Sequence, residues 1–201
     1  MNRYIHARLP VFTFISIIFV LGICFGAIAV KTVEYELRQD IFFYFNSFLE
    51  GFQEIEYEEK SLLADSMKFN LLNIFVIWSF GLSMILMPLI IVLVFFKGFL
   101  LGFTVGFLVS EFSFKGILMA LAAVFPQNLI IIPIYILSSV MAIYLSIEIF
   151  KYYRGKSAIK LEDLAIYTVE MAILAGILLL ASLVETYLSP LLLRLLIAFV
   201  L

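Results

Sequence analysis

Uncharged apolar runs long enough to cross a bilayer recur along this chain, and they constrain its fold more than any other feature. The first run, residues 11–30, contains twenty residues without a charged side chain. About 20 apolar residues in a helix span the hydrocarbon core of a membrane. Of the 201 residues, 65% are hydrophobic and 14% are charged, whereas an average soluble domain is about half apolar and about a quarter charged. We therefore predict a single all-α domain, a polytopic bundle of membrane-spanning helices.

The distribution of charge predicts which segments lie on which side of the membrane. Cytoplasmic loops concentrate Lys and Arg. Residues 1–10 carry two arginines, and residues 151–163 carry four lysines or arginines, so both segments are predicted to be cytoplasmic. Residues 31–69 hold four basic and nine acidic side chains and are predicted to form an extracytoplasmic loop.

About five spans fit this arrangement. A kink is expected at Pro88, and Lys97 is expected at the cytoplasmic surface. Residues 116–150 would form a helix of roughly 50 Å, which is too long for a core of about 30 Å, so we expect a broken span or a re-entrant pair. Residues 188–201 are too short to span and are predicted to form an interfacial or half-inserted helix. The predicted spans are residues 11–30, 70–96, 98–112, 116–150 and 164–186.

Several kinds of chemistry are excluded by what the chain lacks. It has one His and one Cys, whereas a zinc site needs three or four ligands and an internal disulfide needs two cysteines. The three aspartates, Asp40, Asp65 and Asp163, all fall in predicted loops. No nucleotide-binding or zinc-protease motif occurs. We therefore predict no enzyme activity, no metal, no cofactor and no nucleic-acid partner.

Small residues recur at every fourth position in the third predicted span, at Gly98, Gly102, Gly106 and Ser110. Positions i and i+4 share one face of a helix, and small residues on a face let another backbone approach closely. The stripe is interpreted first as internal helix packing. A homodimer interface and a permeation path are the alternatives.

Polar residues also interrupt the apolar sequence of the predicted broken span, where Pro126, Gln127 and Asn128 are followed by Pro133. Proline breaks a helix and removes a backbone donor, and amide side chains can satisfy the freed carbonyl groups. This site either stabilises a kink, or lines a pore or docks a partner. Glu170 is a carboxylate inside the fifth span, and such groups are functional candidates by default; a bond to a neighbouring helix is the simpler interpretation.

The extracytoplasmic loop contains an amphipathic segment over residues 40–52. Its apolar face predicts a helix that lies on the membrane surface or packs on the bundle. Docking of a partner protein is the alternative. The residues on this face are Ile41, Phe45, Phe48, Leu49 and Phe52.

The chain closely resembles the stage II sporulation protein M family of endospore-forming bacteria. The resemblance is carried by PLIIVLVFFKGFLLGFTVGFLV at residues 88–109 and FPQNLIIIP at 125–133, supported by GICFGAIA at 22–29 and VETYLSP at 184–190. It covers nearly the whole sequence. Related membrane proteins outside the sporulation branch tend to carry His-Gly after the proline at which this chain has Gln127 and Asn128.

The resemblance implies a non-catalytic membrane scaffold for engulfment in the mother-cell septal membrane. It further implies that the partners are stage II sporulation proteins D and P, which remodel peptidoglycan, and it supplies no catalytic residues. The competing hypothesis is a transporter or channel for a small solute or ion that uses the broken helix near residues 126–128.

Overall fold

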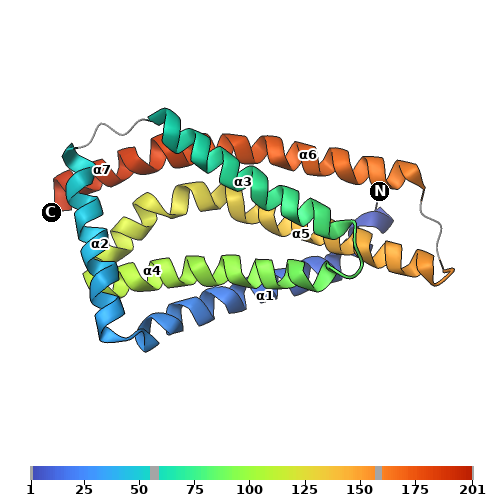
Figure 1. The fold of residues 1–201 in the computed structure, drawn as a ribbon, viewed down its shortest axis with the longest axis horizontal. Coiled ribbons are helices and arrows are strands. Elements are labelled where there is room, and N and C mark those ends of the chain that lie inside the picture. The colour runs from blue at the N-terminus through green and yellow to red at the C-terminus, as the bar shows by residue number, and fades with distance from the viewer. Residues whose placement is uncertain (1, 55–58, 157–159, 201) are drawn as a thin grey trace.

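A computed structural model of the protein describes residues 2–54, 59–156 and 160–200, and these ranges contain helices and no strand (Figure 1). The predicted all-α fold is confirmed. The helices are α1 (Asn2–Ala29), a 3-10 turn (Val30–Thr32), α2 (Tyr35–Glu54), α3 (Glu59–Gly81), α4 (Met87–Ala123), α5 (Phe125–Tyr153), α6 (Leu161–Leu183), a π-helix (Val184–Leu188) and α7 (Ser189–Val200).

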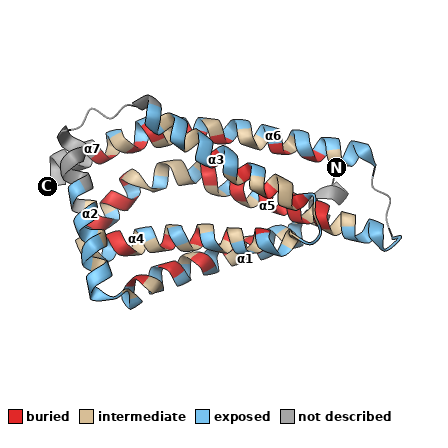
Figure 2. Ribbon diagram, in the orientation of Figure 1, coloured by how far each residue is buried: buried red, intermediate tan, exposed pale blue. Residues whose placement is uncertain are grey.

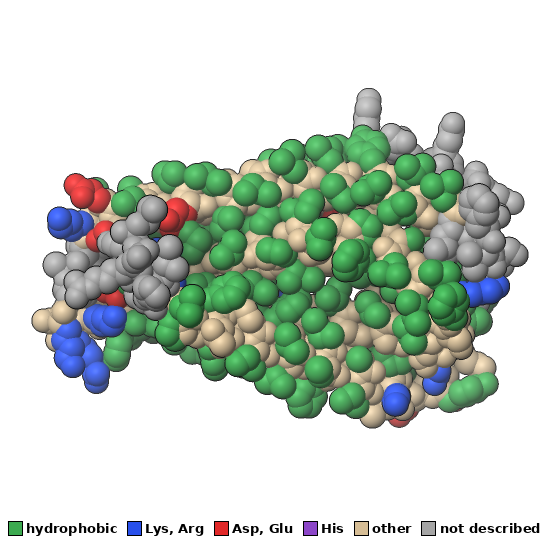
Figure 3. Space-filling view, turned by 180° about the vertical axis from the view of Figure 1, so that it is seen from behind, with side chains coloured by type: hydrophobic (Ala, Val, Ile, Leu, Met, Phe, Trp, Pro, Cys, Tyr) green, Lys and Arg blue, Asp and Glu red, His purple; other side chains and the backbone are tan. Residues whose placement is uncertain are grey.

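The helices α1, α3, α4, α5 and α6 run along the long axis of the molecule, and α2 crosses one end of them (Figure 1). We call this end the α2 end. The N-terminus, the α3–α4 loop, the last turn of α5 and the first turn of α6 lie at the opposite end (Figure 1). The last turn of α5 contains Lys151 and is followed by Arg154, so we call this end the basic end. In the space-filling view, charged side chains gather near the two ends and hydrophobic side chains cover the region between them (Figure 3).

The hydrophobic exterior identifies this bundle as a membrane protein. The segments Arg8–Thr32, Met87–Ala123, Phe125–Tyr153 and Leu161–Leu193 are long and apolar enough to cross a bilayer. Large apolar side chains such as Ile17, Phe75 and Leu180 are more than half exposed along the middle of the bundle. Burial is instead concentrated where the helices face one another (Figure 2). Such an exterior is stable in lipid, because lipid tails are as apolar as these side chains and no hydrophobic effect drives their burial.

Helix α5 forms the centre of the bundle and packs against α1, α3, α4 and α6. Its buried residues include Ser138, Ser139 and Ser146. The hydroxyl groups of Ser138 and Ser139 donate to the carbonyl of Tyr135, and that of Ser146 donates to the carbonyl of Gly81. These bonds satisfy the hydroxyl groups in a region without water, and their small side chains let α5 sit close to its neighbours.

The division between the predicted second and third spans is wrong. Helix α3 ends at Gly81, and α4 begins at Met87 after a short apolar loop. Pro88 therefore lies in the first turn of a helix, where its missing N–H costs nothing, and does not kink a long span. Consequently Lys97 does not end a helix, because α4 continues through it and joins residues 87–97 to 98–112.

The remaining helix boundaries also differ from the predicted ones in detail. A turn inside α4 at Ser113, with φ of 51° and ψ of -124°, sends residues 114–123 back along the bundle. The interruption before α5 falls at Val124, two residues before Pro126. Toward the C-terminus, α6 continues through the π-helix into α7, so the predicted fifth span and the predicted interfacial helix are joined without a loop over the described residues.

Candidate functional site

The glycines of the α4 stripe pack against two glycines of α1, Gly22 and Gly26. A Cβ atom added at Gly98 would lie 2.3 Å from the carbonyl oxygen of Phe19, and one at Gly102 would lie 2.1 Å from that of Ile23. On the facing helix, a Cβ atom added at Gly22 or Gly26 would lie 2.3 or 2.0 Å from a carbonyl oxygen of α4. The two backbones therefore interlock, and α1 of the same chain covers the face that could otherwise have paired with a second copy.

Ser110, the last residue of the predicted stripe, belongs to a different contact. Arg38 of α2 donates one hydrogen bond to Ser110 at 2.7 Å and forms an ion pair with the carboxylate of Glu111. The ring of Phe112 lies 5.6 Å from that of Phe42 and 5.5 Å from that of Phe45. These contacts, which we call the α2 latch, hold α2 across α4 just before the turn at Ser113.

The apolar face predicted for α2 is described only in part. Ile41 and Phe45 are partly buried, and Phe45 packs on a small cluster formed by Leu108 and Met119. The side chains of Phe48, Leu49 and Phe52 lie outside the described residues. Phe43 lies on the opposite side of the helix and is 68% exposed, and its chain neighbour Tyr44 is 74% exposed; Tyr35, in the first turn, is 73% exposed.

The polar residues of the predicted broken span bond locally and to the C-terminal helix. The Asn128 side-chain amide donates to the carbonyl of Val124 at 2.8 Å, at the point where the helix is interrupted. The Gln127 side-chain oxygen accepts a hydrogen bond from the Ser189 hydroxyl of α7 at 2.9 Å. Pro126 occupies the first turn of α5, and Pro133 lies inside it.

The Glu170 carboxylate lies toward the basic end of the bundle, where its nearest cation is Arg8. The two charged groups are 3.9 Å apart, and about a third of each side chain is exposed. The guanidinium of Arg8 also lies 5.2 Å from the ring centroid of Tyr144. These contacts connect α1, α5 and α6.

A group of polar side chains between α3, α6 and the π-helix was not predicted from the sequence. The amide nitrogen of Asn70 donates to the Ser182 hydroxyl at 3.0 Å and lies 3.5 Å from both the Ser66 hydroxyl and a carboxylate oxygen of Glu185. Ser66 in turn donates to Glu185. We call these four residues the polar cluster; Asn70 is 4% exposed and Ser182 is fully buried.

Lys97 of α4 lies beside this cluster. Its ammonium group is 5.7 Å from the ring centroid of Phe69 and 6.0 Å from that of Tyr135, which is the geometry of cation–π contacts. The Glu185 carboxylate acts on it electrostatically. The sequence does contain a signal for this site: Lys97 is a lone lysine inside an apolar run of more than twenty residues. Charged side chains are rare in membrane spans and are usually functional there.

The helix is distorted next to the polar cluster. Residues 184–188 form a π-helix, a rare conformation that often occurs at functional sites. Thr186 within it is 7% exposed, and its hydroxyl group has no hydrogen-bond partner among the described residues. Within the described ranges, no group of three or more His, Cys, Asp or Glu side chains is placed to hold a metal ion. The charged and amide groups of the cluster can bind polar ligands and hold helices together.

The fold and these contacts define a polytopic helical membrane protein whose few internal polar groups connect its helices. A family profile described as stage II sporulation protein M matches residues 15–190 of the 201 residues. The chain belongs to this family, which confirms the resemblance noted in the sequence and makes it a sporulation-related membrane protein. Searches of curated proteins and of solved structures gave no match.

Proposed function

We propose that this protein is a non-catalytic membrane scaffold for engulfment, which localises and organises stage II sporulation proteins D and P. Family membership supports the connection with sporulation. The observation that carries the scaffold role is α2, a helix latched across one end of the bundle with aromatic side chains exposed on its outer side. Aromatic residues are enriched at protein–protein interfaces, and the α2 latch holds them in place before a partner binds.

The orientation proposed for the protein places α2 on the extracytoplasmic side. The basic end, with Lys151, Arg154 and Lys156, would then face the cytoplasm, as the preference for positive charges inside requires. This orientation makes the N-terminus cytoplasmic and directs the exposed aromatic face of α2 toward the cell wall. The membrane proposed is the septal, engulfing membrane of the mother cell.

The proposal is tested by recovering proteins D and P with the tagged full-length chain from membranes of sporulating cells. The test variant combines Phe43→Ser and Tyr44→Ser on α2. The matched control combines Tyr152→Ser and Tyr153→Ser, two exposed aromatic residues near the basic end. We expect recovery to fall in the test variant and to be unchanged in the control. Undiminished recovery after replacement of the whole exposed α2 face would refute α2 as the docking surface.

A transporter or channel is the second candidate function, and the polar cluster with Lys97 is the observation that favours it. Groups of this kind line solute paths at mid-membrane depth in transporters. Ion and solute flux across liposomes containing the purified chain tests this candidate. Flux that is lost in Glu185→Gln would support transport, and the absence of flux would reject it.

A further inference from the structure

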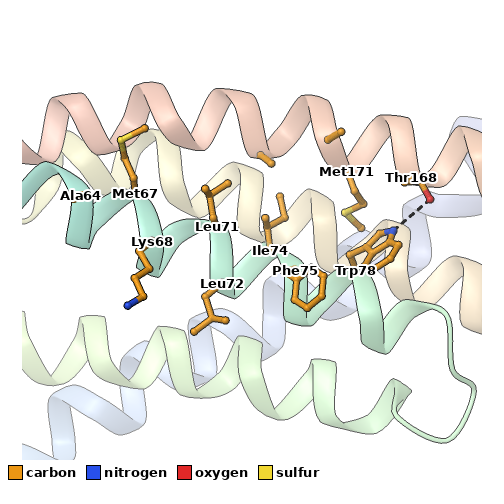
Figure 4. Close-up of a pocket in the computed structure, with 12 residues that line it drawn as sticks. Ala64, Met67, Lys68, Leu71, Leu72, Ile74, Phe75, Trp78, Thr168 and Met171 are labelled. Atoms are coloured by element: carbon orange, nitrogen blue, oxygen red, sulfur yellow. Dashed lines mark hydrogen bonds between the residues drawn. The ribbon is translucent and has the colours of Figure 1, made fainter.

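An apolar groove of about 830 Å³ runs between α3 and α6 (Figure 4). Its volume is in the range of about 300–1,000 Å³ found for small-molecule sites. Its walls are side chains of both helices, including Leu71, Phe75, Met171 and Ala172. Lys68 and Trp78 are ten residues apart on α3, which corresponds to roughly 15 Å of helix. That length is about half of the hydrocarbon core, so the groove has the length and polarity of an acyl-chain site.

Polar groups occupy both ends of this groove. At one end, the indole nitrogen of Trp78 donates to the Thr168 hydroxyl at 3.3 Å. At the other end, the exposed Lys68 side chain extends from α3 toward α4 (Figure 4). Among the described residues Lys68 forms no ion pair within 4 Å.

A second cation lies near the same depth on the facing helix. The ammonium group of Lys97 lies beside the ring of Phe69, the chain neighbour of Lys68. Glu185 is the carboxylate that acts on Lys97, and it already accepts a hydrogen bond from Ser66. Placing a positive charge within the membrane is unfavourable. Two lysines at a similar depth therefore favour the binding of an additional anion beside them.

The short uncharged part of α3 brings lipid headgroups toward this point. Between Lys68 and the end of α3 at Gly81 the helix carries no charged side chain over residues 69–81, or roughly 20 Å, which is shorter than the core of about 30 Å. A short apolar stretch is accommodated by local thinning of the bilayer. Polar headgroups on the α2 side are therefore expected to approach Lys68.

We propose that this groove binds an anionic phospholipid, with an acyl chain along α3 and α6 and the phosphate at Lys68. Lys97 adds positive potential from α4. The occupant is a lipid because one molecule must supply both a flexible apolar chain and an anion at the end of the groove. The site is separate from the exposed α2 face and does not depend on the scaffold proposal.

The experiment adds equal amounts of phosphatidylglycerol and phosphatidylcholine to the purified full-length chain in a neutral detergent. Native mass spectrometry then counts the lipids retained. We expect phosphatidylglycerol to be retained preferentially. Lys68→Ala should weaken its retention about fivefold, the effect of one charge near a membrane surface, and Lys68→Arg should preserve the preference. Lys115→Ala, at an exposed lysine elsewhere on the chain, is the control and should change nothing.

The walls of the groove are tested separately. Ala172→Phe fills the groove and should lower the retention of both lipids, whereas Ile173→Phe on an exposed neighbouring position of α6 should not. A phosphatidylglycerol with a photoreactive acyl chain should label α3 or α6. Equal retention of the two lipids, or a preference that survives Lys68→Ala, would overturn the proposal. Crosslinks from position 172 to a protein or to a second copy of the chain would overturn it as well.

Discussion

Replacing Gly102 with alanine should separate α1 from α4 and destabilise the whole bundle. The added Cβ atom would lie 2.1 Å from the carbonyl oxygen of Ile23 and 2.7 Å from its Cα atom. Carbon–oxygen contacts between packed helices are about 3.3 Å or longer, so α1 would have to move away by about 1 Å. Since the obstacle is backbone, a change of rotamer cannot relieve it.

The free-energy cost follows from this displacement. Overpacking typically costs about 1–3 kcal/mol, and a gap of about 1 Å at the neighbouring glycine contacts forfeits up to about half of their dispersion energy. Alanine returns about 1 kcal/mol of helix propensity. We therefore expect Gly102→Ala to lower the free energy of unfolding by about 2 kcal/mol.

Two other glycines of this chain provide matched controls. A Cβ atom at Gly176 meets nothing within 4 Å, and one at Gly106 meets its nearest atom at 3.1 Å. Gly176→Ala should therefore stabilise the protein by about 0.5–1 kcal/mol. The free energy of unfolding of Gly106→Ala should lie between those of Gly102→Ala and Gly176→Ala. Reversible unfolding in mixed detergent–SDS micelles, followed by the fluorescence of the single tryptophan, measures all three. Equal stability of Gly102→Ala and Gly176→Ala would refute the interlock, as would loss of an oligomer without loss of monomer stability.

Three further predictions concern polar contacts. Arg38→Met should release α2, so that limited proteolysis cuts residues 31–58 faster. Glu111→Gln should accelerate proteolysis less, because the hydrogen bond from Arg38 to Ser110 remains. Unchanged proteolysis in both variants would contradict the α2 latch. Asn70→Ala should lower the free energy of unfolding by about 0.6–1.7 kcal/mol, from the average to the largest value found for hydrogen bonds between membrane helices. A neutral result in the same unfolding assay would count against the polar cluster. Arg8→Ala should cost less than about 0.5 kcal/mol because its ion pair is partly exposed, and a larger loss would show a stronger role for Glu170.

The sequence predicted the class of fold because lipid imposes a simple requirement. Backbone polar groups in a bilayer must be satisfied within the chain, so apolar runs of about twenty residues become helices. The boundary between Gly81 and Met87 was missed because the loop is apolar and carries no charge. The available signal was local: a glycine at the end of one helix and Pro88 in the first turn of the next.

Contacts between distant helices were beyond the reach of sequence patterns. The stripe at Gly98 and Gly102 predicted close packing, but its spacing does not specify the partner helix. The matching pair, Gly22 and Gly26, carries the same spacing and was the signal that could have found it. No pattern in a single sequence places Asn70 beside Glu185, because the two residues meet only when α3 packs on α6.

The scaffold role is tested most directly by the positions of fluorescently labelled proteins D and P in sporulating cells. Both should concentrate at the engulfing septum when the intact chain is present. Both should disperse along the membrane when the chain is absent or carries the Phe43→Ser and Tyr44→Ser changes. Normal concentration at the septum in cells that lack the chain would contradict the account.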